Sequence, residues 1–143
     1  MTTKGRCFCG AIQYEFDGDP TMVEYCHCES CRRQTSSPVA MFLMVPKTSL
    51  RFTKGQPKEY SSSPGVHRSF CGDCGSPLYY RTERRPTIID LFHGTLSDPA
   101  ALAPQFHVHS QEQLPWFEIV DELPRYAVGS SAGGPMRHGT RRA

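Results

Sequence analysis

The sequence has no apolar run of the length that a membrane span requires, and it carries little net charge. Its 16 Lys and Arg residues against 14 Asp and Glu give a formal charge of +2. So small an excess argues against nucleic acid or a membrane as a partner. Met1–Gly5 has the features of neither a secretory leader nor a lipidation motif. We therefore expect a protein of a reducing compartment, the cytoplasm.

Apolar residues are also scarce, at 38% of 143 residues. A chain of this length forms one domain with a core of its own, but a metal centre would add to its stability. Long amphipathic helices and internal repeats are absent. Short alternating or apolar segments, such as Ala11–Phe16, Val39–Val45 and Ile88–Phe92, lie between Gly and Pro residues instead. This pattern predicts a mainly β fold with short helical turns at most.

No cysteine is isolated in the sequence. All seven lie in three short clusters, which are Cys7-Phe8-Cys9, Cys26-His27-Cys28-Glu29-Ser30-Cys31 and Cys71-Gly72-Asp73-Cys74. In a reducing compartment such clusters bind metal more often than they form disulfides. Zinc is the expected metal, because soft thiolates in tetrahedral geometry suit it.

Two partitions of the cysteines are open. Cys28 and Cys31 with Cys71 and Cys74 would make a zinc ribbon, with the other three cysteines left over. Alternatively, Cys7 and Cys9 join Cys71 and Cys74 in a closed four-thiolate site, and the remaining three form a second site with one open position. Three ligands at i, i+2 and i+5 can bind one metal from a single loop, so the spacing favours the second partition. An open position on zinc is where chemistry takes place.

The cysteine motifs resemble those of the glutathione-dependent formaldehyde-activating enzyme family, which shares its domain with centromere protein V. The resemblance is carried by Cys7-x-Cys9-Gly10, Cys26-His27-Cys28-x-x-Cys31-Arg32, Phe70-Cys71-x-x-Cys74-Gly75-Ser76-Pro77-Leu78, Asp90–His93, Phe106–Val108 and Pro115–Phe117. It extends over residues 5–127, which we expect to be one zinc-binding domain. We expect residues 128–143, with Arg137, His138, Arg141 and Arg142, to form a disordered basic tail.

The resemblance implies a fold and a metal content. The fold would be an Mss4-like β-tent of short antiparallel strands held by zinc knuckles. Two zinc ions per chain would bind, a structural one at Cys7, Cys9, Cys71 and Cys74 and a second one at Cys26, Cys28 and Cys31.

The resemblance also implies an activity. The protein would be a carbon–sulfur lyase acting on a thiol–aldehyde adduct such as S-hydroxymethylglutathione, with the thiol bound at the three-cysteine zinc. The alternative is a non-catalytic β-tent binding module in which both zinc ions are structural. An open zinc position favours the enzyme, because a binding module has no need of one.

Three further residues are candidates for a role at the second site, and three more are candidates for structural roles. His27 lies between two metal ligands and could act in catalysis. Arg32 and Arg33 directly follow the ligands and could bind a carboxylate of glutathione. One of His107 and His109 is expected to support the fold. Trp116, in an aromatic segment, is expected in the core or in a pocket wall.

Overall fold

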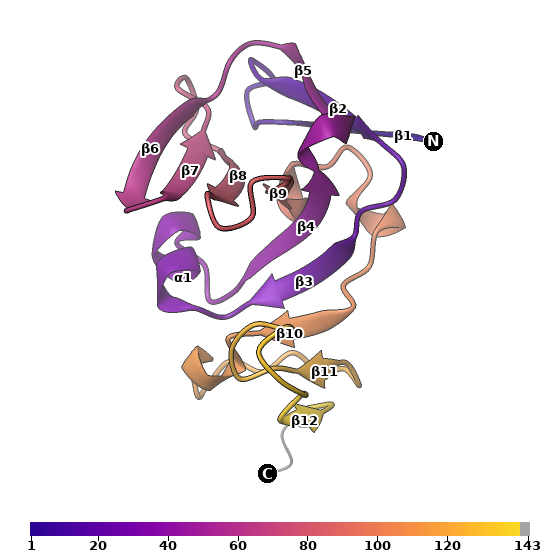
Figure 1. Ribbon diagram of the computed structural model, residues 1–143, viewed down its shortest axis with the longest axis vertical. Helices are drawn as coiled ribbons and strands as arrows, with labels where there is room; N and C mark the ends of the chain where they lie inside the picture. Colours follow the sequence, from indigo (N-terminus) through magenta and orange to yellow (C-terminus); the bar gives the residue numbers. More distant parts are fainter. Residues whose placement is uncertain (141–143) are drawn as a thin grey trace. The chain divides into compact units, whose positions relative to one another are not determined.

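A computed structural model describes residues 1–140 of the chain, which divide into two compact units (Figure 1). Unit 1 comprises Met1–Met22 and Phe42–Ala103. Unit 2 comprises Val23–Met41 and the chain from Pro104 onward. Two of the three divisions fall inside strands, β3 (Met22–Cys26) and β4 (Ala40–Pro46), and the third lies between Ala103 and Pro104, so each unit is built from two separate stretches of sequence.

Unit 1 is built from antiparallel strands. One sheet has the order β1 (Thr2–Arg6), β2 (Gln13–Asp17), β5 (Leu50–Lys54). The other strands follow one another in the order β4, β9 (Ile88–Phe92), β8 (Pro77–Thr82), β7 (Val66–Phe70), β6 (Lys58–Ser63). Figure 1 shows β6, β7 and β8 side by side. The turn that joins β1 to β2 carries Cys7 and Cys9, and the turn that joins β7 to β8 carries Cys71 and Cys74.

The core of unit 1 follows from the alternation of its strands. In β2, the side chains of Tyr14 and Phe16 are 1% and 0% exposed, and the residues beside them face outward. Leu43 of β4 and Leu91 of β9 pair with each other and are both fully buried. Each of these side chains stabilises the fold by about 1.5–3 kcal/mol through removal from water. The 3₁₀ turns of this unit are Lys47–Ser49, His93–Thr95 and Pro99–Ala101.

Unit 2 contains one helix and short strands. They are β3, α1 (Glu29–Thr35), β10 (Phe106–Val108), β11 (Pro124–Arg125) and β12 (Arg137–His138), with a 3₁₀ turn at Ser110–Glu112. Strand β10 lies between β3 and β11 and runs parallel to both, whereas β12 runs antiparallel to β11. The orange and yellow end of the chain in Figure 1 shows β10, β11 and β12 in succession. The sheet order places His107 of β10 directly beside Tyr25 of β3.

The chain beyond Val128, which we expected to be disordered, contributes β12. The Met136 amide donates to the Arg125 carbonyl at 2.9 Å, and the Gly139 amide donates to the Leu123 carbonyl at 3.0 Å. Arg141 and Arg142 lie outside the described residues. Backbone pairing with β11 is what places this stretch, and pairing of that kind leaves no signal in a Gly- and Ser-rich composition.

The mainly β class predicted from the sequence is confirmed, with parallel pairs at β10 in addition to antiparallel ones. A core position for Trp116 is wrong, because its side chain is 72% exposed and stacks edge-on with its neighbour Phe117. Among residues 1–140, no helix is both long enough and apolar enough to cross a membrane.

Candidate metal centres

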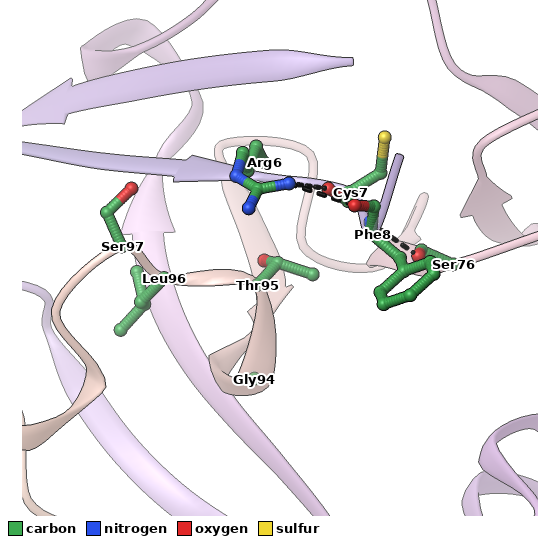
Figure 2. A pocket seen from close by; sticks show the side chains of 8 residues that line it. All are labelled: Arg6, Cys7, Phe8, Ser76, Gly94, Thr95, Leu96 and Ser97. Carbon is green, nitrogen blue, oxygen red and sulfur yellow. Dashed lines mark hydrogen bonds between the residues drawn. The ribbon is translucent and has the colours of Figure 1, made fainter. Parts of the chain in front are cut away.

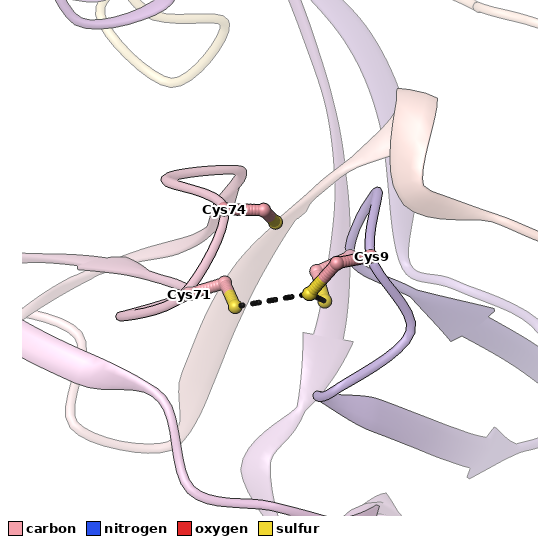
Figure 3. A group of neighbouring side chains, drawn as sticks. Cys9, Cys71 and Cys74 are labelled. Carbon is pink, nitrogen blue, oxygen red and sulfur yellow. Dashed lines mark hydrogen bonds between the residues drawn. The ribbon is translucent and has the colours of Figure 1, made fainter.

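Four cysteines of unit 1 bring their sulfurs together from two turns. The Sγ atoms of Cys7, Cys9, Cys71 and Cys74 all lie within 4.8 Å of one another. Figure 3 shows thiols of the two turns pointing toward each other, with a sulfur–sulfur distance of 3.9 Å between Cys9 and Cys71. The Sγ atoms of Cys7 and Cys9 are 3.6 Å apart. A zinc ion with four sulfurs at about 2.3 Å requires sulfurs about 3.8 Å apart, so the group fits tetrahedral zinc.

Each turn owes its shape to local backbone features. Gly10 and Gly75 both have positive φ, at 80° and 78°, a conformation that other residues adopt rarely. Their amides donate to the carbonyls of Cys7 and Cys71, at 3.2 and 2.8 Å. Hydrogen bonds from Ser76 lower the pKa of Cys74 to about 5, which favours the thiolate that a metal needs.

A cavity of about 420 Å³ lies against the first of these turns (Figure 2). Arg6 lines it and donates to the carbonyls of Cys7 and Phe8, at 3.2 and 2.9 Å. The Phe8 side chain is 87% exposed, and the Thr95 hydroxyl is occupied by hydrogen bonds to the Tyr14 hydroxyl and the Phe92 carbonyl. Arg6 therefore helps to hold the turn, and the Thr95 hydroxyl already has two partners within the fold.

Three cysteines of unit 2 form a second group within a single loop. Cys26 ends β3, Cys28 is the N-cap of α1, and Cys31 lies in the first turn of that helix. All three sulfurs lie within 4.8 Å of one another, and those of Cys26 and Cys31 are 3.6 Å apart. Cys26 and Cys31 are buried, whereas Cys28 is half-buried. The thiols are thus grouped four plus three, and the zinc-ribbon partition does not correspond to the structure.

The start of α1 explains why this loop brings the sulfurs together. Cys28 has an extended backbone, and its sulfur accepts a hydrogen bond of 3.3 Å from the Cys31 amide, as N-cap side chains do. Glu29 in the first turn pairs with Arg33 at 2.9 Å, an i, i+4 pair. Ser36 ends the helix with a left-handed backbone, at φ 54°.

The charges of the three thiols are coupled. Hydrogen bonds from Cys26 and then Cys31 lower the pKa of Cys28 to about 2, while proximity to the other two sulfurs raises the pKa of Cys26. One thiolate therefore suppresses ionisation of its neighbours, because like charges this close repel one another. A cation such as zinc relieves this repulsion, so this donor set also suits zinc. Within residues 1–140, no further Cys, His, Asp or Glu ligand atom joins the group.

His27 is buried, at 1% exposure, and its ring points to another histidine. Its Nε2 lies 2.8 Å from Nδ1 of His107, and Nε2 of His107 lies 2.8 Å from a carboxylate oxygen of Asp121. The other oxygen of Asp121 accepts a hydrogen bond of 2.6 Å from Arg125. Burial, followed by repulsion from His107, lowers the pKa of His27 to about 4. A catalytic role for His27 stays a prediction.

The connection of His27 to Asp121 and Arg125 was not predicted from the sequence. His107 was expected only as one of two candidates for a structural role, and Asp121 and Arg125 were not singled out. Burial lowers the pKa of His107, although its hydrogen bond to Asp121 opposes the shift. Burial alone would raise the pKa of Asp121, but hydrogen bonds from His107 and then Arg125 lower it below its ordinary value.

The two arginines that follow the loop have different surroundings. Arg32 donates through Nη1 to the main-chain carbonyls of His27 at 2.5 Å and Glu112 at 2.6 Å. It thereby ties the loop from Cys26 to Cys31 to the 3₁₀ turn at Ser110–Glu112. Arg33 is exposed and holds Glu29 through Nε. Carboxylate binding by either arginine stays a prediction.

Comparisons with known proteins identify the family of the chain. The profile of the family described as "Glutathione-dependent formaldehyde-activating enzyme" matches residues 2–112. A protein of Schizosaccharomyces pombe named as an uncharacterized lyase is 36% identical over 95 residues, which cover 64% of this chain and 69% of that protein. A crystal structure of a Rhodobacter sphaeroides protein has a TM-score of 0.56 at 23% identity, over 66% of this chain and 87% of that one.

The last comparison shows a shared fold. The family match includes all seven cysteines and stops short of Trp116, Asp121 and Arg125. The matched residues are well over half of the chain, and the match includes both cysteine groups. The chain therefore belongs to the glutathione-dependent formaldehyde-activating enzyme family.

Proposed function

We propose that the protein is a zinc-dependent carbon–sulfur lyase that acts on a thiol–aldehyde adduct similar to S-hydroxymethylglutathione. The observation that carries the proposal is the contrast between the two cysteine groups. One has the four sulfurs of a closed structural zinc site, whereas the other has three, with no fourth ligand atom among residues 1–140. A site with three protein ligands leaves a position for a substrate. Family membership and the lyase name of the yeast relative support the same class.

Residues Cys26, Cys28 and Cys31 would hold the catalytic zinc. Zinc bound there would supply a positive centre at which a substrate sulfur stays deprotonated near neutral pH. Because Cys26 and Cys31 are buried and Cys28 is half-buried, the substrate would approach from the side of Cys28. Arg32 would keep the loop in place through the His27 carbonyl.

The proposed reaction breaks the bond between the substrate sulfur and the hydroxymethyl carbon. The hydroxyl oxygen gives its proton to water as its bond to carbon becomes a carbonyl, and the electron pair of the broken bond stays on sulfur. The products are formaldehyde and a thiolate. The reverse reaction joins the same two molecules. Glutathione is the proposed thiol, and exposed Arg33 is the proposed contact for one of its carboxylates.

The test measures the exchange between free and thiol-bound ¹³C-formaldehyde by NMR, with glutathione and with smaller thiols. Wild-type protein with two zinc ions per chain is expected to accelerate the exchange. Cys28→Ser is expected to keep the fold and return the rate to background. Ser30→Ala is the matched control, because Ser30 is exposed on the same loop and has no thiol.

Two outcomes would overturn the proposal. One is a zinc-loaded wild-type protein that accelerates the exchange with none of the thiols. The other is a Cys28→Ser variant that unfolds as a whole, because the second zinc would then be structural. Either result would favour the alternative, a non-catalytic β-tent binding module with two structural zinc ions.

A further inference from the structure

A series of hydrogen bonds connects Arg125 to Asp121, Asp121 to His107 and His107 to His27. While both histidines are neutral, this series allows only one arrangement of protons. The Asp121 carboxylate can only accept, so Nε2 of His107 carries a proton and donates to it. Nδ1 of a neutral His107 is then an acceptor, so Nε2 of His27 donates to it. Arg125 already balances the charge of Asp121, which disfavours a second positive charge on His107. The carboxylate therefore determines the tautomers of both rings.

His27 is held on its main chain as well as on its ring. Its amide donates to the Val108 carbonyl at 3.1 Å, and its carbonyl accepts from Arg32. Because His27 lies between Cys26 and Cys28, any rotation of its backbone would displace both of these sulfurs. Fixing His27 therefore fixes the spacing of the three-sulfur group.

The far end of the series of hydrogen bonds is anchored by the last stretch of the chain. Arg125 is 1% exposed and donates to the main-chain carbonyls of Ile119 and Leu123, at 2.7 and 2.9 Å. The Asp121 amide donates to the Thr140 hydroxyl at 3.0 Å. These residues lie beyond residue 112, where the family match ends. The buried guanidinium of Arg125 is therefore connected, through Asp121, His107 and His27, to the loop from Cys26 to Cys31.

We propose that His107, Asp121 and Arg125 are positioning residues that hold His27, and with it the loop from Cys26 to Cys31, in the metal-binding conformation. The inference rests on the proposed function in one respect, namely that the three-sulfur group binds zinc. These three residues do not bind the metal themselves and affect the cysteines only through His27. A positioning shell of this kind is worth about 10- to 100-fold in metal affinity.

The first experiment compares His107→Gln with His93→Gln. A Gln at 107 can still donate to Asp121, but it does not reproduce the acceptor that His27 Nε2 needs. His93 is the matched control, because it is also buried, at 8% exposure, and its ring Nε2 lies 2.7 Å from the Leu102 carbonyl oxygen within unit 1, whereas the three-cysteine group belongs to unit 2. The measurement is the competition of a chromophoric chelator for zinc, which resolves the weaker from the tighter site.

His107→Gln is expected to weaken zinc binding at the three-cysteine group about 10- to 100-fold and to leave binding at the four-cysteine group unchanged. His93→Gln is expected to leave both affinities unchanged. Equal zinc affinities in the two variants would overturn the proposal. A purely structural role of His107 would lower the stability of the fold without separating the two zinc sites.

A second experiment reads the tautomers directly, through the ring ¹⁵N signals of His27 and His107. In Asp121→Asn, the amide oxygen is expected to turn to Arg125 and the amide nitrogen to His107, because Arg125 can only donate. Both histidines would then carry the proton on Nδ1 instead of Nε2. Unchanged ring signals in folded Asp121→Asn would overturn the proposal.

The two experiments separate this inference from the proposed function. The wild-type protein could fail to accelerate formaldehyde exchange while His107→Gln still loses zinc affinity. That pair of results would refute the proposed lyase activity and support the proposed positioning role. Active wild-type protein whose His107→Gln variant binds zinc normally would refute the positioning residues alone. If Asp121→Asn fails to fold, the zinc affinities of His107→Gln and His93→Gln decide whether the positioning role holds.

Discussion

Asp121→Ala is expected to lower the free energy of unfolding by about 3 kcal/mol. The substitution leaves the guanidinium of Arg125, which is 1% exposed, without the carboxylate oxygen 2.6 Å away. Breaking a buried ion pair costs about 3–5 kcal/mol, because the remaining charge stays desolvated. The lower end applies here, since Asp121 itself is 20% exposed and Glu118 lies 3.9 Å from Arg125.

The assay is thermal or urea unfolding of zinc-loaded protein. A chain of this size has a stability of about 10 kcal/mol, so the variant should remain folded at 25 °C with a Tm about 10 °C lower. Asp17→Ala is the control, because it removes a carboxylate at a similar distance, 2.8 Å, from the guanidinium of Arg51. That pair is exposed, so water replaces the lost carboxylate and the Tm should change much less. Equal Tm losses in the two variants would refute the argument from burial.

Three further predictions concern other parts of the chain. Tyr14→Phe removes a buried hydroxyl that lies 2.6 Å from the Thr95 hydroxyl, and should cost about 1 kcal/mol in urea unfolding; no change would mean that water satisfies Thr95. Hydrogen bonds from Arg81 lower the pKa of Glu59 from 4.5 to about 2. The stability that this carboxylate contributes is therefore present above pH 4.5 and lost as the pH falls to about 2, so the Tm difference between wild type and Glu59→Gln should narrow over that interval. Arg33→Ala should raise KM for glutathione and leave KM for an uncharged thiol unchanged; equal effects on both thiols would exclude carboxylate binding by Arg33.

The grouping of the cysteines could be predicted because its determinants are local. Cys7 and Cys9 are separated by one residue, and Cys71 and Cys74 by two, so each pair is brought together by one turn. Only the pairing of the two turns is a long-range property. The count of seven thiols reduced the choices for that pairing to a small number of partitions.

The series of hydrogen bonds behind His27 could not be predicted in the same way. His27 and His107 are 80 residues apart and meet because β3 and β10 pair in parallel. No periodicity in either short strand encodes that register. Asp121 and Arg125 lie in the stretch Glu118–Arg125, where half of the residues are charged, so a buried ion pair has no signal in the composition.

The two cysteine groups differ in what keeps their sulfurs in place. At the four-cysteine site, two turns with glycines of positive φ face each other, so a bound metal closes the site from both sides. At the three-cysteine site, the ligands come from one loop, and no second turn among residues 1–140 contributes a ligand. An open ligand set of this kind keeps its spacing only if other contacts hold the loop. His27 makes those contacts through its amide, its carbonyl and its ring. We therefore infer that His107, Asp121 and Arg125 keep the sulfurs of the three-cysteine group in position, as the second turn does in the four-cysteine group.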